Sequence, residues 1–324
     1  MRIGVIGGGA WGTALAQVTA AGGEDVMLWA READVVSAIN EARENRLFLA
    51  GVTLAPSITA TSELSALDDC EALLIVTPAQ HMRAVLEATV PRARPIVLCA
   101  KGIEASSQLL MSQVAAQVCP DAPVAVLSGP TFAHEVAAGL PTAVTLASEN
   151  GELAQRLAAR LARPYFRPYV TDDVIGAEIG GAVKNVLAIA CGVVEGCGLG
   201  QNARAALIAR GFAEMTRFGL ARGAFAETLG GLSGLGDLVL TCSSTASRNF
   251  ALGKGLGEGR GAAELLAGRT VAEGAFTAPV LQRAARAAGV EMPVVDGVCA
   301  LLNGEAKVSA VVGQLLARPL RREA

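Results

Sequence analysis

Lys184 is the residue whose type and setting best suit proton transfer. It lies in the run 178–190, which is dominated by alanine, valine, isoleucine and leucine. A lysine is uncommon in so apolar a run unless it is paired or functional. We expect it near the start of a second domain's first helix, facing a cleft, where desolvation and the helix dipole ease proton loss. The same pattern fits a helix-end lysine that extends its ammonium group to water, and the pattern favours neither interpretation.

Residues 7–12, Gly-Gly-Gly-Ala-Trp-Gly, fit the pattern G-x-G-x-x-G. The pattern alone is weak, but here it follows a strand-like run, residues 2–6, and opens a helical run. In that context Gly7 permits the tight turn, Gly9 lets the backbone approach a pyrophosphate, and Gly12 lets the helix pack on the strand. The loop predicts a dinucleotide site; a purely structural strand–helix turn is the alternative.

Arg31 stands at the end of the second strand-like run, 22 residues after Gly9. Many NAD sites have an acidic residue about 20 residues beyond the loop. A cation can instead pair with the 2′-phosphate of NADPH, so we expect NADPH to be preferred. Glu32 follows directly, which leaves the use of NADH open, and an ordinary solvated arginine is the alternative.

A second polar block, residues 230–249, is rich in glycine, serine and threonine. Asp237 lies among its glycines, before an apolar run. Ser247, Arg248 and Asn249 offer a hydroxyl, a guanidinium group and an amide, all of which bind phosphate. The alternative is a polar loop in which Ser247 is the N-cap of a helix.

Other chemistries have little support in the sequence. His134 begins His-Glu-x-x-x and lacks the second histidine of a zinc peptidase motif. Leu235 replaces the final glycine of a nucleophile elbow. The seven cysteines are scattered and form no C-x-x-C pair. We therefore expect no metal site, and a lysine or a carboxylate as the proton partner of any hydride transfer.

Together these blocks resemble the NAD(P)-dependent glycerol-3-phosphate dehydrogenases of the bacterial type. The likeness covers essentially the whole chain, and several such blocks in one order are specific. Ala79 is a departure, because serine is common in the family at that place. The segments that carry the resemblance are residues 7–16, 100–104, 128–133, 181–186, 202–208, 234–238 and 247–249.

The resemblance implies reversible reduction of dihydroxyacetone phosphate to sn-glycerol 3-phosphate with NADP(H) or NAD(H), which supplies glycerophospholipid synthesis. It implies that Lys184 donates the proton to the carbonyl oxygen and that Lys101 touches both substrate and cofactor. The other implied substrate contacts are Gly129, Thr131, Asp237, Ser247, Arg248 and Asn249. Besides Gly7, Gly9 and Gly12 of the loop, the implied cofactor contacts are Trp11, Arg31, Lys101, Ala133, Arg248, Val271 and Glu273.

The elements that must position these residues change in character near residue 180. Before it, short apolar runs alternate with helical patterns, which predicts a Rossmann-like α/β domain, residues 1–180, with a doubly wound, mostly parallel sheet. After it, long segments rich in alanine and leucine predict an all-α substrate-binding domain, residues 181–324. The expected strands are residues 2–6, 25–29, 73–76, 95–99, 124–127, 143–146 and 166–169.

The composition agrees with such a protein. The chain has 324 residues, of which 52% are hydrophobic and 18% charged, and this excludes a disordered chain. A net charge of −3 and an aromatic content of 4% argue against nucleic-acid binding. We expect no signal peptide, because the chain starts directly in a strand-like run, and no membrane span, because the run 186–194 is shorter than the ~20 residues required. A cytoplasmic homodimer is the resulting expectation.

Two other functions stay open. A two-domain reductase for another small keto acid, such as a ketopantoate or β-hydroxyacid enzyme, also combines a glycine loop with a helical lysine. The cluster 247–249 favours a phosphorylated substrate instead. A non-catalytic dinucleotide sensor would need the glycine loop but no buried lysine.

Overall fold

The structure is a computed structural model that describes residues 2–89, 93–267 and 272–317. Its contacts divide the chain into two compact units. The first comprises Met1–Gly181 with Ala224–Asp237, and the second comprises Ala182–Gly223 with Leu238–Ala324. The first division lies one residue beyond the predicted boundary at residue 180, whereas the grouping of Ala224–Asp237 with the first unit was not foreseen.

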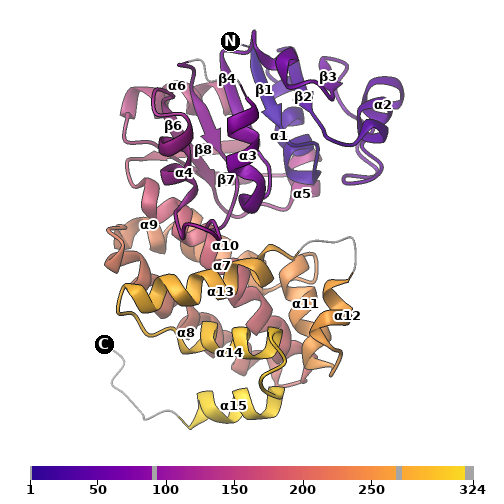
Figure 1. Ribbon diagram of the computed structural model, residues 1–324. Coiled ribbons are helices and arrows are strands. Elements are labelled where there is room, and N and C mark those ends of the chain that lie inside the picture. The colour runs from indigo at the N-terminus through magenta and orange to yellow at the C-terminus, as the bar shows by residue number, and fades with distance from the viewer. Residues whose placement is uncertain (1, 90–92, 268–271, 318–324) are drawn as a thin grey trace. The chain divides into compact units, whose positions relative to one another are not determined.

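The first unit is built on one eight-stranded sheet with the order β3-β2-β1-β4-β5-β6-β7-β8 (Figure 1). Neighbouring strands are parallel, except that β6 and β7 are antiparallel. The prediction of an α/β fold with a mostly parallel sheet is thereby confirmed. The strands are β1 (Ile3–Ile6), β2 (Val26–Trp29), β3 (Ile58–Thr61), β4 (Ala72–Ile75), β5 (Ile96–Leu98), β6 (Val124–Ser128), β7 (Thr142–Ala147) and β8 (Phe166–Thr171).

β3 is the strand that the sequence did not predict. Of its four residues only Ile58 and Ala60 are buried, because β3 is an edge strand that pairs with β2 alone. It therefore lacks the continuous apolar run that marks β1 and β4, whose residues are all buried.

Helices cover both faces of the sheet. Val5 of β1 belongs to one core cluster together with Leu15, and Ile6 belongs to the other together with Val114. Because side chains alternate along a strand, Val5 and Ile6 point to opposite faces of the sheet, and each packs under one of the two helical layers. The layer beside Val5 contains α1 (Ala10–Ala20), α2 (Ala33–Ala42), α5 (Ala133–Ala137) and α6 (Gly151–Leu161), and the layer beside Ile6 contains α3 (Met82–Ala88) and α4 (Met111–Val118).

The carboxyl ends of β1, β4, β5 and β6 lie along one edge of the sheet, because these four strands are parallel neighbours. The glycine loop follows β1, Thr77 follows β4, Lys101 follows β5 and Gly129 follows β6. The strand order also reverses between β1 and β4. In open α/β sheets ligands bind at such an edge, outside such a reversal.

Helices are the only regular elements among the described residues of the second unit, as predicted. Its helices α7 and α11 approach closely at glycines: a Cβ atom on Gly192 would lie 2.1 Å from the carbonyl oxygen of Phe250. One on Gly253 would lie 1.9 Å from the carbonyl oxygen of Ile189. Part of the high glycine content therefore serves helix packing. The helices are α7 (Val174–Gly196), which begins in the first unit, α8 (Gly200–Ala221), α10 (Asp237–Cys242), α11 (Arg248–Gly257), α12 (Ala262–Leu266), α13 (Glu273–Ala287), α14 (Pro293–Leu302) and α15 (Val308–Leu316).

Two further short elements, α9 (Ala226–Gly230) and the π-helical turn η3 (Leu232–Gly236), lie in the segment that joins the first unit. The first unit also has the 3-10 turns η1 (Leu64–Leu67) and η2 (Ala79–His81).

α7 is the one helix among the described residues that is long and apolar enough to cross a membrane. Of its most apolar 18-residue window, 94% is buried. Core helices of globular proteins have the same length and composition, so α7 by itself does not indicate a membrane span.

Candidate active site

The glycine loop connects β1 to α1, as its motif predicts. Gly7 has a φ of +129°, and a Cβ atom on it would lie 2.7 Å from the carbonyl oxygen of Val76. A Cβ atom on Gly12 would lie 1.8 Å from the carbonyl oxygen of Gly7. On Gly9, by contrast, a Cβ atom would meet no atom within 4 Å. The backbone is thus tightly packed at Gly7 and Gly12, whereas there is free space next to Gly9.

The start of α1 is suited to hold a pyrophosphate. Gly9 is the N-cap without a side-chain cap, and the first turn contains no acidic residue. The backbone N–H groups and the helix dipole therefore favour an anion. Trp11 Nε1 and Thr77 Oγ1 are buried and have no hydrogen-bond partner in the part of the chain that the structure describes. Since buried polar atoms usually have partners, these residues fit a bound dinucleotide.

Asn45 supports the glycine loop from outside the motif. Its side chain is completely buried, and Nδ2 donates to the Gly8 carbonyl and to Thr13 Oγ1, at 2.8 Å each. Its Oδ1 accepts the backbone N–H of Phe48 at 3.2 Å. Asn45 was not predicted from the sequence, because the loop that carries it has no periodicity or spacing linking it to the motif.

Arg31 lies just after β2, where the sequence places a cofactor-discriminating residue. Its side chain is 79% exposed and pairs with Glu32, with 2.9 Å between Nη2 and Oε1. A group that attracts a 2′-phosphate and a group that accepts a ribose hydroxyl therefore stand side by side.

Lys101 is at the centre of a polar cluster in the first unit. Its Nζ lies 2.7 Å from Oδ2 of the fully buried Asp237 and donates to the carbonyl oxygen of Gly129 at 3.1 Å. Thr131 Oγ1 donates to the same carbonyl at 3.3 Å. The structure thus brings together four of the predicted substrate-contacting residues: Lys101 and Thr131 donate to the Gly129 carbonyl, and Asp237 pairs with Lys101.

Two buried hydroxyl groups belong to the same unit: Ser128, in a segment that carries the family resemblance, and Ser233, in the nucleophile-elbow pattern rejected above. Neither was predicted to contact a ligand. Ser128 Oγ and Ser233 Oγ have no hydrogen-bond partner among the described residues. A Cβ atom on Gly181 would lie 3.2 Å from Ser128 Oγ and 3.2 Å from Lys101 Cγ. Ser128 therefore lies beside the Lys101 side chain.

Lys184 lies in the middle of α7, not near the start of a helix as predicted, and is hydrogen-bonded within the second unit. It is 6% exposed, and its Nζ donates to Thr241 Oγ1 at 3.0 Å. The ammonium group is therefore buried, in contrast to the interpretation in which it extends to water. Thr241 lies on α10 within the polar block that the sequence indicated, but its own role was not predicted.

Asn249 connects two helices of the second unit. Its Nδ2 donates to Asn185 Oδ1 at 3.0 Å, and its Oδ1 accepts the Gly274 N–H at 2.9 Å. The Gly274 donor fixes which end of the amide is oxygen. The residue next to Lys184 is thus connected to the first turn of α13.

The other two members of the cluster 247–249 lie at the start of α11. Ser247 is its N-cap and accepts the Phe250 N–H at 3.3 Å, which is the alternative that the sequence left open. The hydroxyl proton of Ser247 is still a donor. Arg248 is exposed at the first position of the helix.

The remaining predicted cofactor contacts are spread over both units. Ala133 is the first residue of α5, which packs against α1. Glu273 is the first residue of α13, and Val271 lies outside the described residues. Within the described ranges, no group of three His, Cys, Asp or Glu side chains is placed to hold a metal ion.

The sheet, its glycine loop and the open helix start define a dinucleotide-binding α/β protein with a separate helical unit. Two family models match the chain, the NAD-dependent glycerol-3-phosphate dehydrogenase N-terminus over residues 2–154 and the corresponding C-terminus over residues 173–313. The chain belongs to the NAD-dependent glycerol-3-phosphate dehydrogenase family, as its motifs predicted.

Individual relatives extend this likeness over the full chain. A glycerol-3-phosphate dehydrogenase (NAD(P)+) from Erythrobacter litoralis is 65% identical over 323 residues, covering 99% of this chain and 98% of the relative. One from Sphingopyxis alaskensis is 63% identical with the same coverage. The crystal structure of glycerol-3-phosphate dehydrogenase from Coxiella burnetii has a TM-score of 0.93 at 39% identity and covers 98% of this chain and 99% of that chain.

Proposed function

We propose that this protein catalyses the reversible, NAD(P)H-dependent reduction of dihydroxyacetone phosphate to sn-glycerol 3-phosphate and so supplies glycerophospholipid synthesis. The names of its full-length relatives support the activity. Among the structural observations, the buried ammonium group of Lys184 carries the proposal, because a dinucleotide sensor without chemistry needs no such group.

Lys184 acts as the general acid. Bound NAD(P)H supplies the hydride that reaches the ketone carbon. Negative charge then develops on the ketone oxygen, and Lys184 stabilises it and donates a proton. In the reverse direction Lys184 accepts the alcohol proton. Thr241 Oγ1 accepts one N–H of the ammonium group and thereby orients it.

Lys101 binds both substrate and cofactor from the first unit. Asp237 and the Gly129 carbonyl accept two of its N–H groups, and the third is directed to a ligand oxygen. Gly129, Thr131 and Asp237 complete this side of the substrate site. Holding the cation by two fixed acceptors reduces the entropy lost on binding.

Ser247, Arg248 and Asn249 bind the substrate phosphate. The exposed guanidinium group of Arg248 suits bidentate contact with phosphate oxygens. The first turn of α11, with no acidic residue, adds the positive end of a helix dipole. Anchoring the phosphate away from the reacting carbon orients the ketone.

The glycine loop holds the cofactor, with the pyrophosphate above Gly9. The open space at this residue and the unpartnered donor of Trp11 support the assignment. Arg31 faces the 2′-phosphate of NADPH. The full set of proposed cofactor contacts is Gly7, Gly9, Trp11, Gly12, Arg31, Lys101, Ala133, Arg248, Val271 and Glu273.

The activity is tested by following NAD(P)H oxidation with dihydroxyacetone phosphate beside pyruvate and ketopantoate. We expect turnover with dihydroxyacetone phosphate alone; faster turnover of ketopantoate would replace the proposed substrate. Lys184→Ala should retain NADPH binding, measured by nucleotide fluorescence, and lose about 10²-fold or more in kcat. Turnover near that of the wild type would remove Lys184 as the acid.

The protein is further proposed to be a cytoplasmic homodimer. All seven cysteines are free thiols, which suits a reducing compartment. Leu220, Phe276 and Leu316 of the second unit are 51%, 54% and 81% exposed, and such apolar surface favours self-association. Light scattering on a size-exclusion column gives the mass, and a monomer at all concentrations would contradict the dimer.

A further inference from the structure

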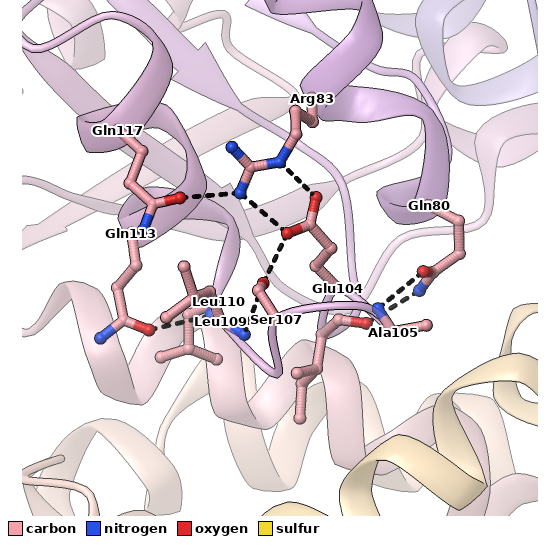
Figure 2. Close-up of polar contacts among 10 residues, drawn as sticks. Gln80, Arg83, Glu104, Ala105, Ser107, Leu109, Leu110, Gln113 and Gln117 are labelled. Carbon is pink, nitrogen blue, oxygen red and sulfur yellow. Dashed lines mark hydrogen bonds and ion pairs between the residues drawn. The ribbon is translucent and has the colours of Figure 1, made fainter.

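The segment that carries Lys101, between β5 and α4, is held by side chains from outside it (Figure 2). Nε and Nη2 of Arg83 each donate to one carboxylate oxygen of Glu104, at 2.9 Å. Ser107 Oγ donates to the same carboxylate at 2.5 Å. Arg83 Nη2 also donates to Oε1 of Gln117 on α4, at 2.8 Å. A carboxylate three residues after Lys101 is thereby fixed between α3 and α4.

Gln80 clamps the backbone on both sides of Glu104. Its Nε2 donates to the Ile103 carbonyl at 2.8 Å, and its Oε1 accepts the Ala105 N–H at 2.9 Å (Figure 2). Gln80 and Arg83 belong to the turn and helix that directly follow β4. β4 is the neighbour of β5 in the sheet, so the turn and helix that follow β4 supply both residues that hold the Lys101 segment.

The anchor at Glu104 is stronger than a surface ion pair. Glu104 is 6% exposed, and the two parallel N–H···O bonds from Arg83 have the geometry that makes arginine–carboxylate pairs strong. The hydrogen bonds from Arg83 hold the pKa of Glu104 below its ordinary value, in spite of burial. The carboxylate therefore stays ionised at neutral pH.

A lysine side chain has four rotatable bonds, so the position of its ammonium group depends on a fixed backbone. We infer that Glu104 is a positioning residue, which acts with Arg83 and Gln80 to hold the backbone from which Lys101 reaches Gly129 and Asp237. The effect on catalysis rests on the function proposed above. The effect on the position of the Lys101 side chain is independent of that function.

The first test measures the reactivity of Lys101 in the folded protein by reductive methylation and peptide mass spectrometry. Wild-type Lys101 is 14% exposed in its side chain, and we expect Glu104→Gln and Arg83→Met each to speed its labelling about threefold or more. Lys254, 43% exposed, is the internal reference. The matched control is Glu24→Gln, which breaks the similarly buried Arg160–Glu24 pair near the opposite ends of the strands. Unchanged Lys101 labelling in both variants would overturn the inference.

The second test is a double-mutant cycle on the reduction of dihydroxyacetone phosphate. Glu104→Gln should lower kcat/KM about tenfold in the wild type and less than about twofold in the Lys101→Met background, because the residue acts through Lys101. Arg83→Lys, which keeps a cation, should recover part of the activity lost in Arg83→Met. Equal losses in both backgrounds would show a general structural role. If neither the wild type nor any variant reduces this substrate, the proposed function fails, but the labelling result still decides the role of Glu104.

Discussion

The ammonium group of Lys101 lies 2.7 Å from Oδ2 of Asp237, although the two residues are 136 positions apart. Asp237 is fully buried, and the Lys101 side chain is 14% exposed. When a buried pair loses one partner, the other charge is left without compensation, which costs more than the pair contributes. The pair therefore couples the proposed substrate site to the stability of the first unit.

Asp237→Ala should lower the free energy of unfolding by about 3 kcal/mol, because it leaves the Lys101 cation without its carboxylate. It should also raise the KM for dihydroxyacetone phosphate about tenfold. Urea denaturation and initial-rate kinetics measure the two effects. The double variant Lys101→Met/Asp237→Ala should lose less stability than the sum of the single variants, and simple additivity would contradict the coupling.

Glu178 gives the first unit a pH-dependent stability. Burial raises its pKa from 4.5 to about 7, although Ser112 donates two hydrogen bonds to it. The folded chain thus keeps a proton that the unfolded chain releases above pH 4.5, so stability falls as pH rises from about 4.5 to about 7. Glu178→Gln keeps an acceptor for the Ser112 N–H and should stabilise the protein by up to about 3 kcal/mol at about pH 8.

Urea midpoints across this pH range check the prediction. The midpoints of Glu178→Gln and the wild type should converge only as the pH falls below about 4.5, where Glu178 is protonated in the unfolded chain as well as in the folded one. Glu214, buried in the second unit with its pKa raised to about 7, supplies the matched comparison, because Glu214→Gln should change the pH profile in the same direction. A constant difference between Glu178→Gln and wild type at all pH values would show that ionisation is not the cause.

Much of the fold was predictable because periodicity is a local property. β1 and β4 are covered on both faces, so their buried residues form continuous runs that a sequence reveals. β3 buries only alternate residues at the sheet edge and gave no such signal. The grouping of Ala224–Asp237 with the first unit likewise depends on long-range contacts, which have no periodicity.

The candidate site could be predicted where a motif identifies its residues. The prediction was incomplete where a residue acts through a partner. Lys101, Gly129 and Asp237 gather as the family pattern implied. Asn45 and Thr241 were missed, because each matters through hydrogen-bond partners that only folding brings to it. Such pairings are fixed by tertiary contacts rather than by spacing along the chain.

Arg31→Ala should weaken NADPH binding more than NADH binding, because only NADPH has a 2′-phosphate for the guanidinium group. We expect the ratio of the two Kd values to shift about tenfold toward NADH. Glu32→Gln should shift it the other way, since it removes the carboxylate that pairs with Arg31. Fluorescence titration measures both constants, and an unchanged ratio in Arg31→Ala would exclude the 2′-phosphate contact.

Arg248→Ala should raise the KM for dihydroxyacetone phosphate about tenfold or more and leave that for unphosphorylated dihydroxyacetone nearly unchanged. The reason is that its proposed contact with the substrate is to the phosphate alone, whereas its proposed cofactor contact acts on both substrates alike. Arg260→Ala is the control, since Arg260 is also exposed in the second unit but pairs with Glu264. Equal effects of Arg248→Ala on the two substrates would defeat the phosphate contact.

Asn45→Ala should impair cofactor binding although Asn45 lies outside the glycine motif. The substitution removes the donor to the Gly8 carbonyl and to Thr13, so the loop loses the contacts that fix its carbonyl direction. We expect the Kd for NADPH to rise about tenfold, together with a loss of about 2 kcal/mol in stability. Asn40→Ala is a matched control, because the side-chain amide of Asn40 also bonds to backbone, with two hydrogen bonds to Ala60 on the edge strand β3. It should lower stability without changing the Kd, and a parallel rise in Kd in both variants would attribute the effect to general loosening of the unit rather than to the loop.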